Sequence, residues 1–412
     1  MAAQEESGAA APAGAMSAVL ATGLLSGLGY GLIFPVAALY GEDAGLSPAA
    51  ITLAIAVHPA MRLISGPAWG RLADRWGRRP VLLAGVALAA VGHAVFGLVG
   101  GALGLGLGRL LTGLGSGETV AAMAVVADLT TPAERARGLG QMRAAVGLGM
   151  LLGPLLGGGL GLINLRLPGI GAAVVSMLCF GMVWWKLPET RRVTNVTPDV
   201  TRVSTPVVAL AIAGAASAAL TLAEAIVPLA IEHVLVPTLD GRVAFWTPWV
   251  AGLAPAQLAL LLTVGVILAW GLTTVVFDGF LSARLVDRLG ERRALVLGLA
   301  RWVVAFALTP AVYRLGVLPG GLAVAATAIP VSLTGVSLAS WLSRRAGADG
   351  QGQMNGAVQS AMALGEVLGP AASGWLYTRA YGLPYQVGAA LLAVMVFAAL
   401  RLPRLADSDV RR

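Results

Sequence analysis

The sequence has few charged residues, and this scarcity is its most informative feature. Only 12% of its 412 residues are charged, whereas 57% are hydrophobic. A chain of this length has room for two or three soluble domains, but each would need a polar surface that this composition does not supply. The composition therefore argues against an ordinary soluble protein and favours a chain that lies in a lipid bilayer.

Cysteine and histidine are also scarce, which excludes several kinds of chemistry. The single cysteine, Cys179, lies in an apolar run and cannot form a disulfide within the chain. The three histidines, His58, His93 and His233, are scattered, with no metal-ligand spacing and no nucleophile–base set. The sequence therefore predicts no enzyme, no metal site and no cofactor.

The net charge of +8 does not indicate a nucleic-acid-binding protein. Of the 28 basic residues, 27 are arginines, and they stand in short clusters between apolar runs. There is no basic face and no interleaving of aromatic residues with the basic ones. The expected partner of this chain is the lipid bilayer, not a nucleic acid.

Long apolar runs predict twelve transmembrane helices, since about 20 apolar residues span a bilayer. We place them near residues 17–40, 47–69, 81–100, 103–127, 139–161, 168–187, 206–232, 256–281, 294–313, 318–342, 354–377 and 386–402. An even number puts both termini on one side. The loops on that side and the C-terminal tail hold 20 basic residues, against 4 in the other loops. The positive-inside rule therefore predicts cytoplasmic termini, in a multi-pass protein of the cell inner membrane.

The chain contains a repeat that divides it into two halves. The segment from Gly70 to Arg79 recurs, with changes, from Ala283 to Arg292, offset by 213 residues. Both copies fall between the second and third predicted helices of a half, where we expect a loop. We therefore predict an all-α membrane fold of two pseudo-symmetric six-helix bundles, residues 1–187 and 206–412, joined by a cytoplasmic linker at 188–205.

The motifs resemble those of the major facilitator superfamily over essentially the whole chain. The segment Gly70–Arg79 matches the superfamily's loop signature G-x-L-x-D-R-x-G-R-R, and Arg109–Gly113 is similar to its R-x-x-x-G motif. The segment Leu187–Thr190 ends the sixth predicted helix, and a similar segment often ends this helix in the family. Gly149–Gly158 resembles the motif G-x-x-x-G-P-x-x-G-G, which is associated with drug:proton antiporters. The resemblance implies transport of a small molecule by alternating access.

The loop signature predicts a conformational latch. Asp74 can accept from the exposed amides of another helix N-terminus, and Arg78 can pair with Asp74 or reach Asp128. The resemblance implies that such a cluster locks the outward-open state, whereas the alternative is that the arginines only anchor the topology. The expected latch residues are Gly70, Asp74, Arg75, Gly77, Arg78, Asp128, Asp287 and Arg288.

Two details of the motifs bear on how the latch and the fifth helix work. Gly70 is expected to allow close backbone approach, and in the second copy Glu291 replaces the arginine, so we expect the first latch to be the stronger one. The antiporter motif places small residues on one face of the fifth helix, where they serve either packing alone or a hinge and seal. Its residues are Gly149, Gly153, Pro154 and Gly157.

Charged residues inside the predicted helices are candidates for the transport mechanism, because a charge in the membrane costs about 3 kcal/mol or more. Glu224 is the leading candidate for carrying protons, with a structural ion pair as the alternative. Glu366 is either a second proton site or the partner of a nearby basic residue, and Glu118 either pairs with Arg143 or contacts another helix. The expected substrate pathway also includes Arg109, Tyr30, Phe34 and Arg143.

These features favour a proton-coupled antiporter that exports small hydrophobic or amphipathic compounds, such as drugs. The alternatives on the same fold are an exporter of a lipid, siderophore or metabolite, and a proton symporter for uptake. The first helix carries no carboxylate between Glu6 and Glu42, which weakens any proton site there. The expected partners are a small-molecule substrate and protons, and we expect a monomer because the repeat already supplies internal pseudo-symmetry.

Overall fold

The computed structural model describes residues 14–131, 134–190, 206–239 and 252–403, except the side chains of residues 136 and 346–353. Most of the predicted linker, 188–205, lies outside the described residues, as do both chain ends. Eleven helical segments of the described chain are long and apolar enough to cross a membrane.

The first half supplies six spans. Four of them are single helices: α3 (Pro48–Trp76), α4 (Arg78–Val99), α7 (Arg135–Ile163) and α8 (Leu167–Lys186). The first span consists of α1 (Ala15–Ile33) and α2 (Ala37–Asp43), and the fourth consists of α5 (Gly101–Leu114) and α6 (Gly117–Leu129).

The second half follows the same plan. The seventh span consists of α9 (Val207–Glu224), α10 (Val227–Ala230), the short π-helix η1 (Ile231–Leu235) and the short 3-10 helix η2 (Val236–Leu239). The eighth span runs through α11 (Pro255–Phe277), the short π-helix η4 (Asp278–Ser282) and α12 (Ala283–Leu289). The remaining helices are α13 (Glu291–Tyr313), α14 (Val317–Ala326), α15 (Ala328–Arg379) and α16 (Leu383–Leu400).

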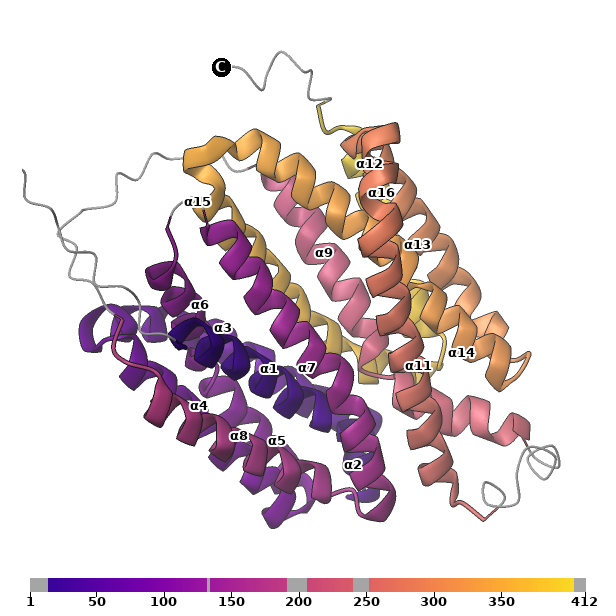
Figure 1. The fold of residues 1–412 in the computed structure, drawn as a ribbon. Coiled ribbons are helices and arrows are strands. Elements are labelled where there is room, and N and C mark those ends of the chain that lie inside the picture. The colour runs from indigo at the N-terminus through magenta and orange to yellow at the C-terminus, as the bar shows by residue number, and fades with distance from the viewer. Residues whose placement is uncertain (1–13, 132–133, 191–205, 240–251, 404–412) are drawn as a thin grey trace, which may run out of the picture.

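Helix α15 forms two spans, not one. It contains 52 residues, and at 1.5 Å per residue it would be about 78 Å long if straight, far more than a bilayer of about 30 Å. Figure 1 shows that α15 bends back sharply between two limbs. The first limb belongs to the span Val317–Arg345, and the second limb corresponds to the eleventh predicted span, residues 354–377. The expected loop between the two is therefore helical, and it contains no proline that would end the helix.

The expected position of the loop motif was wrong as well. Residues Gly70–Trp76 continue α3, and the chain turns into α4 at Gly77 alone, where φ is 105°. In the second copy the same turn is made at Gly290, between α12 and α13, where φ is 77°. Only glycine adopts such backbone angles at little cost, so one residue makes each turn.

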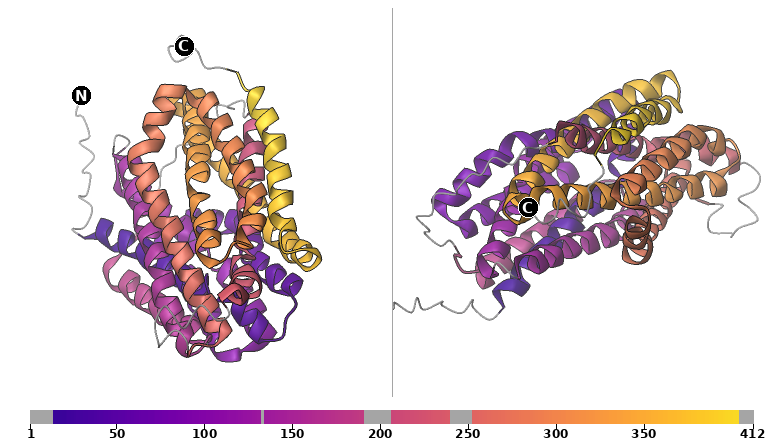
Figure 2. Two further views of the ribbon diagram at one scale, coloured as in Figure 1. Left: turned by 90° about the vertical axis from the view of Figure 1, so that its right-hand side faces the viewer. Right: turned by 90° about the horizontal axis from the view of Figure 1, so that it is seen from above.

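The two bundles are joined at one end and separate at the other (Figures 1 and 2). We call the end with the turns at Gly77 and Gly290 the motif end; α1 begins there and α16 ends there. At the opposite end one apolar core contains residues of both halves, such as Leu39 and Ile231. At the motif end each half has a core of its own, one around Val81 and the other around Val286.

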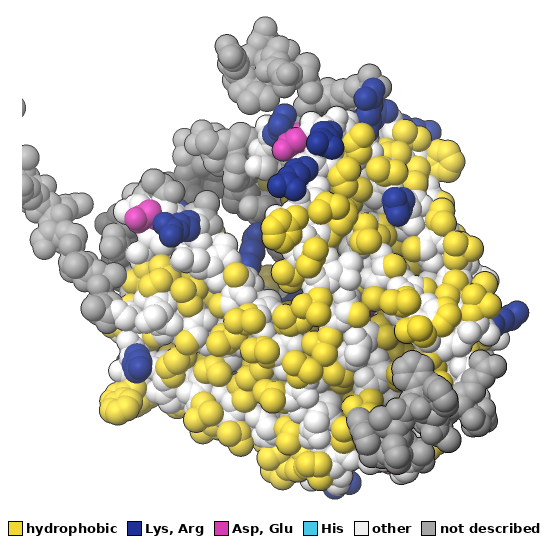
Figure 3. All heavy atoms as spheres, turned by 45° about the vertical axis from the view of Figure 1, so that its right-hand side comes forward, with side chains coloured by type: hydrophobic (Ala, Val, Ile, Leu, Met, Phe, Trp, Pro, Cys, Tyr) yellow, Lys and Arg dark blue, Asp and Glu magenta, His cyan; other side chains and the backbone are white. Residues whose placement is uncertain are grey.

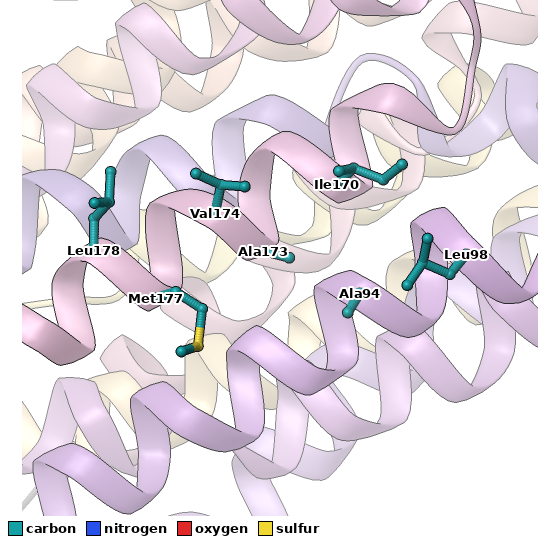
Figure 4. Close-up of a pocket in the computed structure, with 7 residues that line it drawn as sticks. All are labelled: Ala94, Leu98, Ile170, Ala173, Val174, Met177 and Leu178. Carbon is teal, nitrogen blue, oxygen red and sulfur yellow. The ribbon is translucent and has the colours of Figure 1, made fainter.

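The outer surface of both bundles suits lipid. Large apolar side chains are exposed on it (Figure 3), and the same view shows the surface hollowed between the two lobes at the motif end. A shallow apolar hollow of about 330 Å³ lies between α4 and α8 (Figure 4). Its lining includes the exposed side chains of Leu98, Val174 and Leu178. No charged side chain lines this hollow, so we regard it as part of the lipid-facing surface.

Candidate transport site

In the described part of the chain, four spans contain a break made of non-helical residues, and they are the first and the fourth of each half. The breaks fall at residues 34–36, 115–116, 225–226 and 327. Proline has no N–H to donate, so Pro35 explains the first break, and glycine and serine occupy the second. Irregular backbone inside a membrane is tolerated where protein or a water-filled path surrounds it, and transporters bind substrates at such breaks. The four breaks therefore mark the centre of the candidate site.

A buried cluster containing Arg109 lies beside the first break. The Arg109 guanidinium is 5.9 Å from the centroid of the Tyr30 ring. Tyr30 stacks on Phe34 at 6.1 Å and lies 5.5 Å from the His58 ring. Nδ1 of His58 is 3.2 Å from the Thr112 hydroxyl, so the cluster connects α1, α3 and α5. Arg109 thus lies beside the first span, and its part in the substrate pathway stays a prediction.

An ion pair joins the two halves near this cluster. The guanidinium of Arg62, one turn along α3 from His58, pairs with the carboxylate of Glu366 on the second limb of α15. Both side chains are half-buried. Of the two alternatives for Glu366, the structure supports a partner for a basic residue, and a role in proton transfer stays a prediction.

Glu224 and Glu118 lie beside breaks in opposite halves. Glu224 is the last residue of α9 and half-buried, and it makes no hydrogen bond or ion pair within the described part of the chain. The alternative for Glu224, a structural ion pair, therefore has no partner among the described residues. Glu118 stands in the first turn of α6, and its carboxyl group lies beside Ser26 of α1. The possible pair with Arg143 is not formed: the Glu118 carboxyl group lies beside Ser26 of another helix, and Arg143 is exposed on α7.

The charged residues of the first loop motif form a cluster within the first half. Nη1 of Arg78 is 2.6 Å from Asp74, and its Nε is 3.3 Å from Asp128. Glu189, in the segment that closes the sixth span, accepts from the backbone N–H groups of Arg78 and Arg79 at 2.8 and 3.2 Å. It therefore caps the N-terminus of α4, where the helix dipole favours an anion. Sequence reasoning noted Glu189 but missed this contact.

Two details of the expected latch differ from the structure. The expectation that Gly70 allows close backbone approach was wrong, because no atom lies within 4 Å of a Cβ built at Gly70. Gly77 is the constrained glycine instead, since a Cβ there would meet the Glu189 carboxylate. Asp74 itself is 70% exposed and pairs with Arg78 of its own half. The arrangement is therefore a cluster inside one half, and a latch between halves stays a prediction.

The second motif retains an ion pair, with the charges reversed. Glu291 occupies the repeat position of Arg78, and its carboxylate is 2.8 Å from Nε of Arg344, at the motif end of the tenth span. In the first half, Arg78 pairs with Asp128 at the motif end of the fourth span. The second motif has therefore kept an equivalent connection with opposite polarity. Asp287 and Arg288 are exposed and make no ion pair with a described residue.

The glycines of the antiporter motif pack α7 against α1. A Cβ at Gly149 would meet the backbone of Leu24, one at Gly153 would meet Gly31, and one at Gly157 would meet Leu32. Pro154 lies inside α7 between them. In the second half, Gly365 and Gly369 of α15 pack in the same way against the backbone of α9. The packing function is therefore observed in both halves, and a hinge or seal at this face stays a prediction.

A set of polar contacts closes the opposite end, and sequence reasoning did not identify it. Nε2 of His233 on η1 is 2.5 Å from Glu42 of α2, and its Nδ1 is 3.1 Å from the Tyr377 hydroxyl on α15. Nearby, the backbone N–H of Gly374 donates to the Thr52 hydroxyl, and the Gln257 amide donates to the Leu162 carbonyl. Each pair except His233 and Tyr377 joins one half to the other. We call Glu42, His233 and Tyr377 the clasp.

Two six-helix halves around interrupted helices, closed at one end, define a membrane transporter and not an enzyme. The family model described as Major Facilitator Superfamily matches residues 19–275. The chain belongs to this superfamily.

Curated relatives and solved structures agree with this assignment. The chain is 31% identical over 382 residues to the class G tetracycline resistance protein of Vibrio anguillarum, covering 89% of this chain and 91% of that protein. It is 27% identical over 374 residues to multidrug resistance protein 2 of Bacillus subtilis strain 168, covering 87% of each chain. A crystal structure of a bacterial homologue of the human lysosomal transporter Spinster, inward-facing and occupied, matches with a TM-score of 0.71 and 18% identity, covering 96% of this chain and 97% of that chain. The resemblance inferred from the motifs is thereby confirmed.

Proposed function

We propose that this chain is a proton-coupled antiporter that exports small hydrophobic or amphipathic compounds by alternating access. The observation that carries the proposal is the position of Glu224, a half-buried carboxyl group without a described partner, beside the break in the seventh span. A carboxyl group there can bind a proton from one side and release it to the other. Similarity to tetracycline and multidrug resistance proteins supports export of such compounds.

The orientation of the chain gives this proposal a direction. The excess of arginine on the side of the termini favours a cytoplasmic motif end, in the inner membrane of a bacterial cell. The structure then corresponds to a state that is open towards the cytoplasm, in which an exporter takes up its cargo. In the return state we propose that the cluster around Asp74, Arg75 and Arg78 contacts the second half and acts as a latch.

We assign Glu366 and Glu118 secondary roles in coupling. Protonation of Glu366 would neutralise the partner of Arg62 and so weaken a contact between the halves, which links a proton to the change of state. Glu118 lies at the first turn of α6, where it can respond to movement of α1 through Ser26. We propose a monomer in which residues 1–187 and 206–412 move as the two bodies.

Export driven by protons is tested in inverted membrane vesicles with an imposed pH gradient. Wild-type protein should accumulate tetracycline when the vesicle interior is acidic, and Glu224→Gln should abolish the dependence on the gradient. Glu134→Gln is the matched control, since Glu134 is exposed at the motif end and lies outside the site. Gradient-dependent accumulation by Glu224→Gln at the wild-type rate would contradict the assignment of Glu224.

The class of cargo is tested in cells that lack their own exporters. Expression should raise the resistance of such cells to several structurally different amphipathic drugs. A transporter dedicated to one lipid, siderophore or metabolite would give no broad resistance. A symporter for uptake would instead sensitise the cells to drugs that it imports.

A further inference from the structure

Arg109 is a buried cation with no counter-ion in the described structure. Only 5% of the residue is exposed. Its Nε is enclosed and has no hydrogen-bond partner, and no described residue forms an ion pair with its guanidinium. Among the described residues, the guanidinium interacts with the face of Tyr30, whose ring centroid is 5.9 Å away. An aromatic face stabilises a buried cation much less than a carboxylate does.

The surroundings of Arg109 do not supply the missing anion. Residues 15–41 of the first span, which carries Tyr30, include no carboxylate. On α3, His58 and Arg62 face the same cluster, and Arg62 already holds Glu366. On α6, Glu118 lies beside Ser26 and forms no ion pair with a described residue, and on α4 His93 bonds Ser176. A buried charge is normally paired, so the cluster is an incomplete site that favours an anion from outside the chain.

We propose that Arg109 binds the anionic group of the transported compound, and that Tyr30 and Phe34 hold the aromatic or apolar body attached to it. The guanidinium can donate two parallel hydrogen bonds to a carboxylate or to a similar delocalised oxyanion. Tyr30 and Phe34 are half-buried and stacked, so they offer an aromatic surface beside the charge. The preferred substrates are therefore amphipathic organic acids. This inference rests on the proposed function and specifies its substrate class.

Two compounds of the same shape test the charge requirement. The probes are 2-naphthylacetate and its neutral isostere 2-naphthylacetamide, and their binding to the detergent-purified full chain is measured by calorimetry without a proton gradient. We expect the acid to bind wild-type protein 10- to 100-fold more tightly than the amide, about the contribution of hydrogen bonds to a charged group. Arg109→Gln should reduce this ratio to about 1, while Arg109→Lys should keep part of it.

The control variant is Arg301→Gln. Arg301 is an exposed arginine inside α13, in the other half, so its removal should leave the ratio unchanged. Size-exclusion profiles and apparent melting temperatures identify any variant that fails to fold. If Arg109→Gln does not fold, the ratio is measured in Arg109→Lys instead. Equal affinities of wild-type protein for the two probes, or no saturable binding of the acid, would overturn the proposal. Retention of the full preference by Arg109→Gln would overturn it too.

This outcome is separable from that of the proposed function. If the acid is preferred but Glu224→Gln transports like wild type, only the assignment of the proton site fails. If proton-driven export is observed but the acid and the amide bind equally, only the anion site at Arg109 fails.

Discussion

At the scale of single residues, the loop motif contains two glycines with different physical roles. Gly77 has φ 105° and ψ 165°, a region that residues with a side chain rarely adopt, and the Glu189 carboxylate lies where its Cβ would be. Gly70 is an ordinary helical residue of α3 with open space beside it. The first glycine of the signature is therefore free to change in this conformation, and the second is not.

Replacing Gly77 by alanine should destabilise the protein by about 1–3 kcal/mol, because of backbone strain and the displaced cap of α4. Gly70→Ala is the matched control and should be neutral or stabilising by up to about 1 kcal/mol, since alanine is the better helix former. Apparent melting temperatures of the purified proteins measure both effects. A Gly77→Ala variant that melts with wild type would refute the account of this turn.

Residue-scale contacts were only partly predictable from the sequence. The pairing of Arg78 with Asp74 and Asp128 follows from four-residue spacing and from helix ends that meet at one membrane face. The cap that Glu189 provides was not predictable in the same way, because it joins residues 111 positions apart. The Arg62–Glu366 pair spans 304 positions and depends on how the two halves dock.

At the scale of elements, each half connects its third span to its fourth through an ion pair, and the sign of this pair is opposite in the two halves. In the first half α4 carries the cation Arg78, and in the second half α13 carries the anion Glu291. The expectation that the first latch is the stronger one considered Glu291 without its partner. The positive charge that Arg78 of α4 supplies in the first half is supplied in the second half by Arg344 of α15.

Reversing one charge of the second pair should therefore be harmful, and reversing both should not. Arg344→Glu places two carboxylates together and should lower stability by about 1 kcal/mol, because Arg344 is half-exposed. The double variant Glu291→Arg/Arg344→Glu reproduces the polarity of the first half and should recover most of the loss. Apparent melting temperature and drug resistance of expressing cells are the readouts.

Arg293→Glu serves as the control for this pair. It reverses an exposed charge on α13, the helix that carries Glu291, without removing a described contact. Additive losses in the double variant would mean that Glu291 and Arg344 do not act as a pair.

At the scale of the whole molecule, the halves meet at the opposite end, where the clasp joins α2, η1 and α15. The number of spans and the repeat are matters of composition and period, which a sequence displays directly. Which end is closed depends on packing between residues far apart in the chain, such as Leu39 and Ile231. The sequence therefore predicted the two-bundle architecture but not its conformational state.

Loss of the clasp should favour opening of the opposite end. His233→Ala, which removes the contacts to Glu42 and Tyr377, should speed the reaction of a cysteine at Ala38 with an impermeant maleimide several-fold. Ala38 is buried in the core between the halves, and the native Cys179 is also buried, so background labelling should be low. Arg314→Ala removes a polar contact within one half at the same end and should not change the rate. Equal labelling rates with and without His233 would show that the clasp does not hold this end closed.

The central claim is that substrate and protons move in opposite directions through one alternating site. It is tested most directly in proteoliposomes that enclose a pH-sensitive dye, with tetracycline added to one side and no initial pH gradient. The account predicts proton movement opposite to the drug in wild-type protein and none above background in Glu224→Gln. Proton movement in the same direction as the drug, or drug transport without any proton movement, would contradict it.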